Sequence, residues 1–230
     1  MDDVYILQDY DIDYLNDIFF KDKKELQVVS AKQLFKIPLK HLQLFAHQNA
    51  IYSIPTIELA DWLKIHFDLS KAIEIGSGNG ALAKYLDIPA TDSKLQENPE
   101  IATLYKLSQQ PTVQYGENVF KYEAKDAIRK FKPETVIAQW CTHKYNPAMH
   151  DKGGNMYGID EEFIIKNVKN YVFIGNTFTH ANKIILDYPH KSYKMPWLFS
   201  RSRYPNLNII HIWKNKKYEY YQTKGIHQNI

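Results

Sequence analysis

The chain has 230 residues, of which 44% are hydrophobic and 24% are charged, and its formal net charge at pH 7 is +3. These values are ordinary for one α/β domain with an N-terminal extension, and so small a charge gives no electrostatic reason to expect a nucleic-acid-binding protein. There is no run of about 18 apolar residues, so we expect no membrane span. The single cysteine excludes an internal disulfide, and the acidic start, Met1 to Val4, lacks the basic region of a secretory signal. We therefore expect a cytoplasmic protein.

Residues 1–68 are predicted to form a mainly helical N-terminal extension. Ser30 and Gln33 have the spacing of a capping box, and apolar residues follow them until Pro38 interrupts the pattern. Apolar side chains recur at helical spacing over residues 39–46 and again over 54–67.

Residues 69–230 alternate predicted strands and helices, which is the pattern of a mainly parallel sheet. The predicted helices cover residues 82–86, 127–131 and 161–167. The predicted strands cover residues 72–75, 89–92, 119–123, 135–140, 171–175, 184–186 and 208–213. We expect the last two strands to form an antiparallel hairpin at one edge.

A carboxylate and three alternate glycines, Glu74, Gly76, Gly78 and Gly80, stand where the first of these strands meets the first helix. Glycine allows positive φ and a close approach of the backbone to a ligand. With Ala81, the glycines also satisfy the dinucleotide-binding fingerprint, so a nucleotide site and a plain turn are alternatives. That fingerprint has no use for the acid, however, and a buried carboxylate needs a partner. A cationic or amine-bearing ligand would supply one.

The pattern Glu-x-Gly-x-Gly-x-Gly, from Glu74 to Gly80, resembles motif I of the class I S-adenosylmethionine-dependent methyltransferases. The resemblance implies a Rossmann-like α/β fold, with a mainly parallel twisted sheet, helices on both faces and a C-terminal antiparallel hairpin. It also implies binding of S-adenosyl-L-methionine, with the glycine loop and Ser77 under the methionine part and Glu74 helping to position it. The expected activity is methyl transfer to an unidentified acceptor: a small molecule, a protein or a nucleic acid. The N-terminal third matches no pattern shared by the family.

The resemblance implies further cofactor contacts. Asp92, after the second strand, is expected to accept hydrogen bonds from both ribose hydroxyls, although a turn aspartate looks the same. Asp126 is expected near the adenine amino group or at a helix N-cap. Tyr52 is expected over the methionine end, where the alternative is a simple helix start at Pro55 and Thr56.

The loop after the fourth strand faces the acceptor in this family, which implies such a position for Trp140, with a cofactor contact, and for His143 and Tyr145. His143 has the chemistry of a general base, but a structural role fits equally. The loop departs from the amino-methylating enzymes, because Asn146-Pro147 lacks a second proline and an aromatic residue. It departs from the cytosine-C5 enzymes too, because no proline precedes Cys141, which we expect to be a buried small residue.

Other parts of the sequence leave alternatives open. Residues 190–204 interleave cations with aromatic rings, so nucleic acid is a possible partner, but a lid packed by its own rings has the same composition. Asn176 and His180 follow the fifth strand and are secondary site candidates. The spacing of His143 and His150 does not indicate a metal site. The competing functions are an inactive S-adenosylmethionine-binding module, an NAD(P)-binding protein, and an enzyme that uses S-adenosylmethionine for another reaction.

Overall fold

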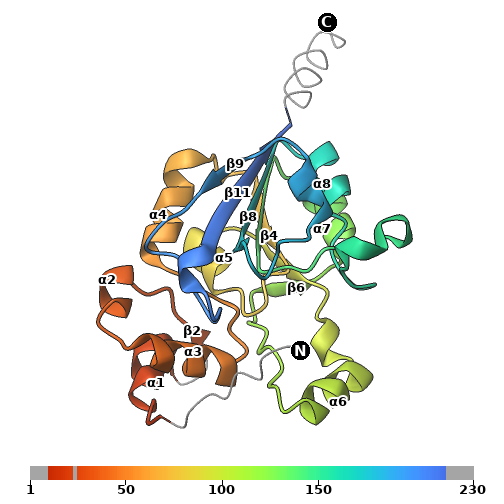
Figure 1. Ribbon diagram of the computed structural model, residues 1–230. Coiled ribbons are helices and arrows are strands. Elements are labelled where there is room, and N and C mark those ends of the chain that lie inside the picture. The colour runs from red at the N-terminus through yellow and green to blue at the C-terminus, as the bar shows by residue number, and fades with distance from the viewer. Residues whose placement is uncertain (1–9, 23–24, 216–230) are drawn as a thin grey trace, which may run out of the picture.

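The computed structural model describes residues 10–22 and 25–215, so the Met1 to Val4 segment lies outside the described residues (Figure 1). Its centre is a seven-stranded sheet with the order β6-β5-β4-β7-β8-β11-β9. The first five strands in this order, β6, β5, β4, β7 and β8, are parallel to one another. Strand β11 runs antiparallel to both of its neighbours, β8 and β9. This confirms the predicted fold class, an α/β fold with a mainly parallel sheet and an antiparallel strand from the C-terminal part of the chain. The strands are β4 (Ala72–Ile75), β5 (Ala90–Asp92), β6 (Val119–Lys121), β7 (Thr135–Gln139), β8 (Asn170–Asn176), β9 (Lys191–Tyr193) and β11 (Asn208–Lys214).

One predicted strand is wrong. Residues Ile184–Asp187 form a 3-10 helix, η3, and the antiparallel partner of β11 at the sheet edge is β9. Ile184 and Ile185 are buried, and Trp213 Nε1 donates a hydrogen bond to the Ile185 carbonyl. A short apolar run of this kind is compatible with either a strand or a buried helical turn, so periodicity alone does not distinguish them.

Helices cover both faces of the sheet (Figure 1). On one face α4 (Ile57–His66) and α5 (Ala81–Leu86) pack against side chains such as Ala72 and Ile137. On the other face α7 (Ala124–Phe131) and α8 (Glu161–Asn167) lie against Ile73, Ile75 and their neighbours. Alternate residues of β4 thus serve opposite faces, as expected for a strand.

The N-terminal extension has a hydrophobic cluster of its own, in which the rings of Phe19 and Phe45 stack 4.8 Å apart. Ala81, the first residue of α5, joins this cluster, so the extension packs beside the glycine turn. The predicted division at residue 68 falls after α4, although α4 packs in the sheet core. The elements of the extension are α1 (Tyr14–Phe19), β1 (Phe20–Lys21), β2 (Glu25–Leu26), α2 (Ala31–Leu34), α3 (Leu39–Gln48) and β3 (Ser53–Ile54), which pairs with β10 (Phe199–Ser200).

The crossover from β5 to β6 leaves the body of the sheet. It contains η1 (Leu95–Glu97) and α6 (Pro99–Leu107), a helix with no buried residue that stands away from the sheet in Figure 1. The chain then returns over the glycine turn, where Asn118 Nδ2 donates a hydrogen bond to the Gly80 carbonyl. The remaining elements are η2 (Pro147–Lys152) and η4 (Pro205–Leu207). Among the described residues, no helix combines the length and the apolar character needed to cross a bilayer.

Candidate functional site

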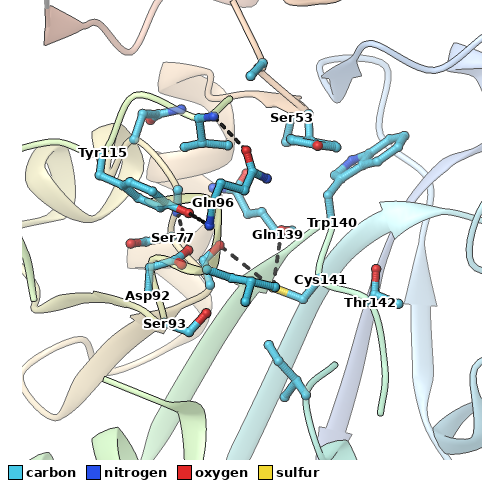
Figure 2. Close-up of a pocket in the computed structure, with 18 of the residues that line it drawn as sticks. Ser53, Ser77, Asp92, Ser93, Gln96, Tyr115, Gln139, Trp140, Cys141 and Thr142 are labelled. Atoms are coloured by element: carbon cyan, nitrogen blue, oxygen red, sulfur yellow. Dashed lines mark hydrogen bonds between the residues drawn. The ribbon is translucent and has the colours of Figure 1, made fainter. Parts of the chain in front are cut away.

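A cavity of about 250 Å³ lies at the carboxyl ends of β4, β5 and β7. From β4 the chain continues to β5 on one side, and later returns through β7 on the other, so the cavity lies where the strand order reverses. Open α/β sheets bind their ligands at this position. Figure 2 shows the side chains of Ser77, Asp92, Gln139 and Trp140 around it. We call this space the glycine-turn cavity. Its other walls come from residues 50–55 of the extension, from the β5–β6 crossover and from residues 155–159 of the loop before α8.

The three glycines of the turn have different tasks. All have positive φ, +56°, +56° and +73° for Gly76, Gly78 and Gly80. A Cβ on Gly76 would lie 2.4 Å from Cys141 Sγ, and one on Gly80 would lie 2.6 Å from Val119, so these two glycines permit close packing. Gly76 and Gly78 line the cavity, whereas Gly80 does not. The turn is thus built for close backbone approach on both of its sides.

Asp92 lines the cavity at the end of β5 and is fixed by the glycine turn. Its Oδ2 accepts a hydrogen bond from the Gly78 N–H at 3.0 Å, and its Oδ1 accepts one from the Lys94 N–H at 2.8 Å. Burial raises the pKa of Asp92, while these two hydrogen bonds act in the opposite direction. A carboxylate has about four acceptor positions, so both oxygens keep capacity for a ligand.

Glu74 is 1% exposed and does not line the cavity. Its partners come from the protein: Oε2 accepts from the Ala83 N–H at 3.0 Å, and Oε1 accepts from Gln139 Nε2 at 2.7 Å. Burial raises the pKa of Glu74 to about 7, although both hydrogen bonds lower it. Gln139 therefore stands between the buried acid and the cavity that it lines.

Two buried polar atoms of the cavity lining have no hydrogen-bond partner among the described residues: Ser77 Oγ and Gln139 Oε1. Leaving a buried polar group unpaired costs about 1–3 kcal/mol, so such pairs of atoms point to a polar ligand. The hydroxyl of Ser77 can donate to an anionic group, whereas the amide oxygen of Gln139 can only accept. Together they match a ligand end that carries both an acceptor and a donor.

Several cavity residues were not predicted from the sequence. Gln96, Val113 and Tyr115 come from the β5–β6 crossover, and Gln139 ends β7. Gln96 Oε1 accepts from the Val113 N–H at 2.8 Å, and a Cβ on Gly78 would lie 3.5 Å from Val113. The crossover thereby covers the glycine turn. Its sequence carries no local signal for this contact.

The structure brings Tyr52, Ser77, Asp92 and Trp140 to one cavity with Gly76 and Gly78, whereas the predicted contacts Glu74 and Gly80 do not line it. It does not bring Asp126 there. Asp126 lies in the first turn of α7, where its exposed carboxylate pairs with Arg129 at 3.0 Å, and the N-cap of that helix is Glu123.

Of the three residues predicted to face the acceptor, Trp140 lines the glycine-turn cavity, whereas His143 and Tyr145 lie outside it. Tyr145 lines another cavity, and its hydroxyl is hydrogen-bonded to His150 Nδ1 at 2.9 Å. His143 is buried, and its Nε2 has no partner among the described residues. Burial and the nearby charge of Lys183 lower the pKa of His143, so its ring is neutral at pH 7. A Cβ on Gly154 would lie 3.0 Å from this Nε2, so Gly154 packs directly against the ring.

The secondary candidates differ as well. Asn176 is fully buried, and its side chain holds the Tyr204 carbonyl and the Asn208 side chain, which is a structural role. His180 lines a cavity on the far side of Trp140, and burial lowers its pKa to about 3. Within residues 10–22 and 25–215, no three His, Cys, Asp or Glu side chains are grouped to hold a metal ion.

No protein-family model matches the sequence, and no curated protein matches it. Solved structures with a related chain path include the tRNA (uracil-54, C5)-methyltransferase of Pyrococcus abyssi in complex with S-adenosyl-L-homocysteine. It is 13% identical, with a TM-score of 0.36 over 68% of this chain and 37% of its own, so this chain spans just over a third of that enzyme. An rRNA methylase from Streptococcus thermophilus is 12% identical, with a TM-score of 0.38 over 69% of this chain and 96% of its own. A mutant of Spodoptera frugiperda DNMT2 is also 12% identical, with a TM-score of 0.34 over 64% of this chain and 50% of its own. Similarity this low identifies no function, which has to be argued from the cavity.

Proposed function

We propose that the protein is an S-adenosyl-L-methionine-dependent methyltransferase. One observation carries the proposal: the glycine turn after β4 and the carboxylate that ends β5, Asp92, line one cavity at the switch point of a sheet whose strand β11 is antiparallel. The fold gives the position of the ligand, and the side chains give its chemistry.

The residues present fit this cofactor. Ser77 Oγ and Gln139 Oε1 are unpaired and would hold the carboxylate and the ammonium group of its methionine part. Asp92 keeps acceptor positions for the two ribose hydroxyls. Tyr115 and Tyr52 supply aromatic surface to the same cavity, whereas Asp126 lies outside it, so we assign no adenine contact to Asp126.

When bound, the cofactor would supply a sulfonium methyl group for transfer to an acceptor lone pair, with the carbon–sulfur electron pair left on sulfur. The protein has to hold the two reactants in line, and orientation alone supplies much of the acceleration of such a reaction. Trp140 and Tyr52 line both the glycine-turn cavity and the cavity beside it, so they form the boundary across which the reactants would meet. His143 is neutral, packs against Gly154 and lies outside the glycine-turn cavity, and the proposed reaction does not require it to transfer a proton.

An NAD(P)-binding protein is the second candidate, because Gly76, Gly78 and Ala81 satisfy the dinucleotide fingerprint. The sheet argues against it. Dinucleotide-binding folds continue with a second set of parallel strands, whereas here the antiparallel β11 is inserted between β8 and β9.

Calorimetric titration with S-adenosylhomocysteine tests the proposal, with NADH as the control. We expect saturable binding of S-adenosylhomocysteine in the micromolar range, typical of specific ligands at about −8 kcal/mol, and no binding of NADH. Binding of NADH alone would contradict the proposal and indicate an NAD(P)-binding protein instead. Binding of S-adenosylhomocysteine without turnover of any acceptor would favour the inactive module.

Asp92→Asn is expected to weaken S-adenosylhomocysteine binding by about tenfold to a hundredfold, because hydrogen bonds to a charged group contribute about 1.5–3 kcal/mol. The matched control is Asp126→Asn, which changes an exposed carboxylate outside the cavity and should leave the affinity unchanged. Both variants are titrated after circular dichroism has shown that they are folded. Equal affinities of the two variants would remove Asp92 from the site.

A further inference from the structure

A second cavity, of about 310 Å³, adjoins the glycine-turn cavity. The two share Tyr52, Trp140 and Thr142 as lining residues, so they meet at the loop that follows β7. We call the second space the Arg201 cavity. If the first cavity holds the methyl donor, the second is the space in which an acceptor can reach it.

The lining of the Arg201 cavity is one-sided in charge. It contains three cationic side chains, Lys152, Lys183 and Arg201, and no aspartate or glutamate. Two of the cations are paired by carboxylates that lie outside the lining: Lys183 with Glu161 at 2.9 Å and Lys152 with Asp187 at 3.2 Å.

Arg201 is different. No carboxylate of the described residues forms an ion pair with it. Its guanidinium carbon lies 3.6 Å from the ring centroid of Tyr52, in a cation–π contact that orients the planar group. A stacked guanidinium keeps its N–H edge for a carboxylate or a phosphate, either of which it can bind with two parallel hydrogen bonds.

The two histidines of the cavity add no charge to it. Burial, and to a smaller extent the nearby charge of Lys183, lower the pKa of His180 and of His143. Both rings are therefore neutral at pH 7, and Arg201 is the one cation of the lining that no carboxylate of the described residues pairs with.

We infer that the Arg201 cavity binds the anionic group, a carboxylate or a phosphate, of a small methyl acceptor, with Arg201 as its main partner. That the ligand is a methyl acceptor depends on the proposed function. That the ligand is an anion does not, because its charge is inferred from the cavity alone. The cavity volume favours a small molecule, since pockets for such ligands occupy about 300–1,000 Å³. Because the two cavities share a wall at Trp140, an acceptor bound here would lie beside the methyl donor. A polymer would place its phosphates along an extended basic surface instead.

The test titrates the ¹⁵N-labelled full chain with inorganic phosphate and, separately, with benzoate, and follows backbone amide shifts by NMR. We expect saturable shifts at residues 140–143, 152–154 and 201 with at least one probe. Arg201→Gln should weaken that binding by about tenfold or more, because it removes a charge-assisted bidentate contact. Arg201→Lys, which keeps the charge but not the fork, should lie between the two. The control Arg129→Gln changes an exposed arginine paired with Asp126 and should have no effect.

The response to each probe decides the chemistry. Saturation by phosphate alone points to a phosphorylated acceptor, by benzoate alone to a carboxylate, and by both to either anion. Saturation by neither, or equal affinity in Arg201→Gln, overturns the inference. Tighter binding of a single-stranded RNA oligonucleotide, with shifts spread well beyond the cavity, would overturn the small-molecule part. The same samples are titrated with S-adenosylhomocysteine: if it does not bind, the proposed function fails while the anion result stands.

Discussion

Lys183→Met is expected to lower the free energy of unfolding by about 3–5 kcal/mol at neutral pH, because it leaves a buried carboxylate without its counter-ion. Lys183 Nζ lies 2.9 Å from Glu161 Oε1 and 2.8 Å from the Cys141 carbonyl oxygen, and the two charged side chains are 1% and 3% exposed. Tyr171 also donates to Glu161 Oε1, whereas Glu161 Oε2 has no partner among the described residues. In the variant, Glu161 must stay as a buried anion or take up a proton. Urea denaturation of the variant and the unsubstituted protein measures the loss.

The matched control is Lys84→Met. Lys84 pairs with Glu25 at 2.7 Å, but the two side chains are 52% and 45% exposed. Its loss should stay below about 1 kcal/mol, as for other surface ion pairs. Adding Glu161→Gln to Lys183→Met should restore much of the stability, because both buried charges are then gone. A Lys183→Met loss no larger than that of Lys84→Met would show that Glu161 is not held as an anion in the folded protein.

This ion pair also organises the boundary between the two cavities. Lys183 holds the carbonyl of Cys141, and Trp140 precedes it with a φ of +55°. The side chain of Cys141 in turn occupies the space beside Gly76. A Cβ at position 76 would clash with its sulfur atom, so this position requires glycine. Burial raises the pKa of the Cys141 thiol well above its usual range, so it is no nucleophile at neutral pH. This agrees with the expectation that Cys141 is a small buried residue.

The sequence predicts the parts of the site whose signals are local. The order of strands and helices, the glycine turn and the acid after β5 each depend on a few adjacent residues. The rule that ligands bind at the carboxyl ends of parallel strands then places Gly78 and Asp92 together, and the structure joins them by a hydrogen bond.

The parts that could not be predicted depend on long loops. Tyr115 reaches the cavity through a crossover that leaves the sheet, and no periodic pattern reports its path. Asp126 follows β6 in sequence as the family pattern suggests, but α7 begins at Ala124 and turns its carboxylate to solvent. Tyr145 lies in the loop that leads to η2 and lines a different cavity from the glycine turn. The buried partner of Glu74 could not be predicted either, because Gln139 lies 65 residues further along the chain.

Glu74→Gln is expected to remove a pH dependence of stability. The pKa of Glu74 is about 7 in the folded protein, against an ordinary value of 4.5 for a glutamate, so the folded state binds the proton more tightly than the unfolded state. Below about pH 4.5 both states are protonated, and the free energy of unfolding then falls as the pH rises towards 7. At 1.36 kcal/mol per pKa unit, the fall is about 3 kcal/mol. Urea denaturation from pH 5 to 8 should show this slope in the unsubstituted protein relative to the variant.

Subtracting the free energies of unfolding of the two proteins at each pH cancels the contribution of groups that titrate in both, such as His143. Asp92 interacts with the charge of Glu74, so its pKa differs slightly between the two proteins. An equal pH slope in the two proteins would contradict the raised pKa. If the glycine-turn cavity binds the methionine part of the cofactor, as proposed, the protonation of Glu74 also affects the affinity for S-adenosylhomocysteine. An ammonium group held at Gln139 Oε1 favours the ionised form of Glu74, which accepts from Gln139 Nε2 and so keeps the amide oxygen towards the cavity. We therefore expect S-adenosylhomocysteine affinity to rise between pH 6 and 8, with a proton released on binding, and expect this rise to be absent in Glu74→Gln.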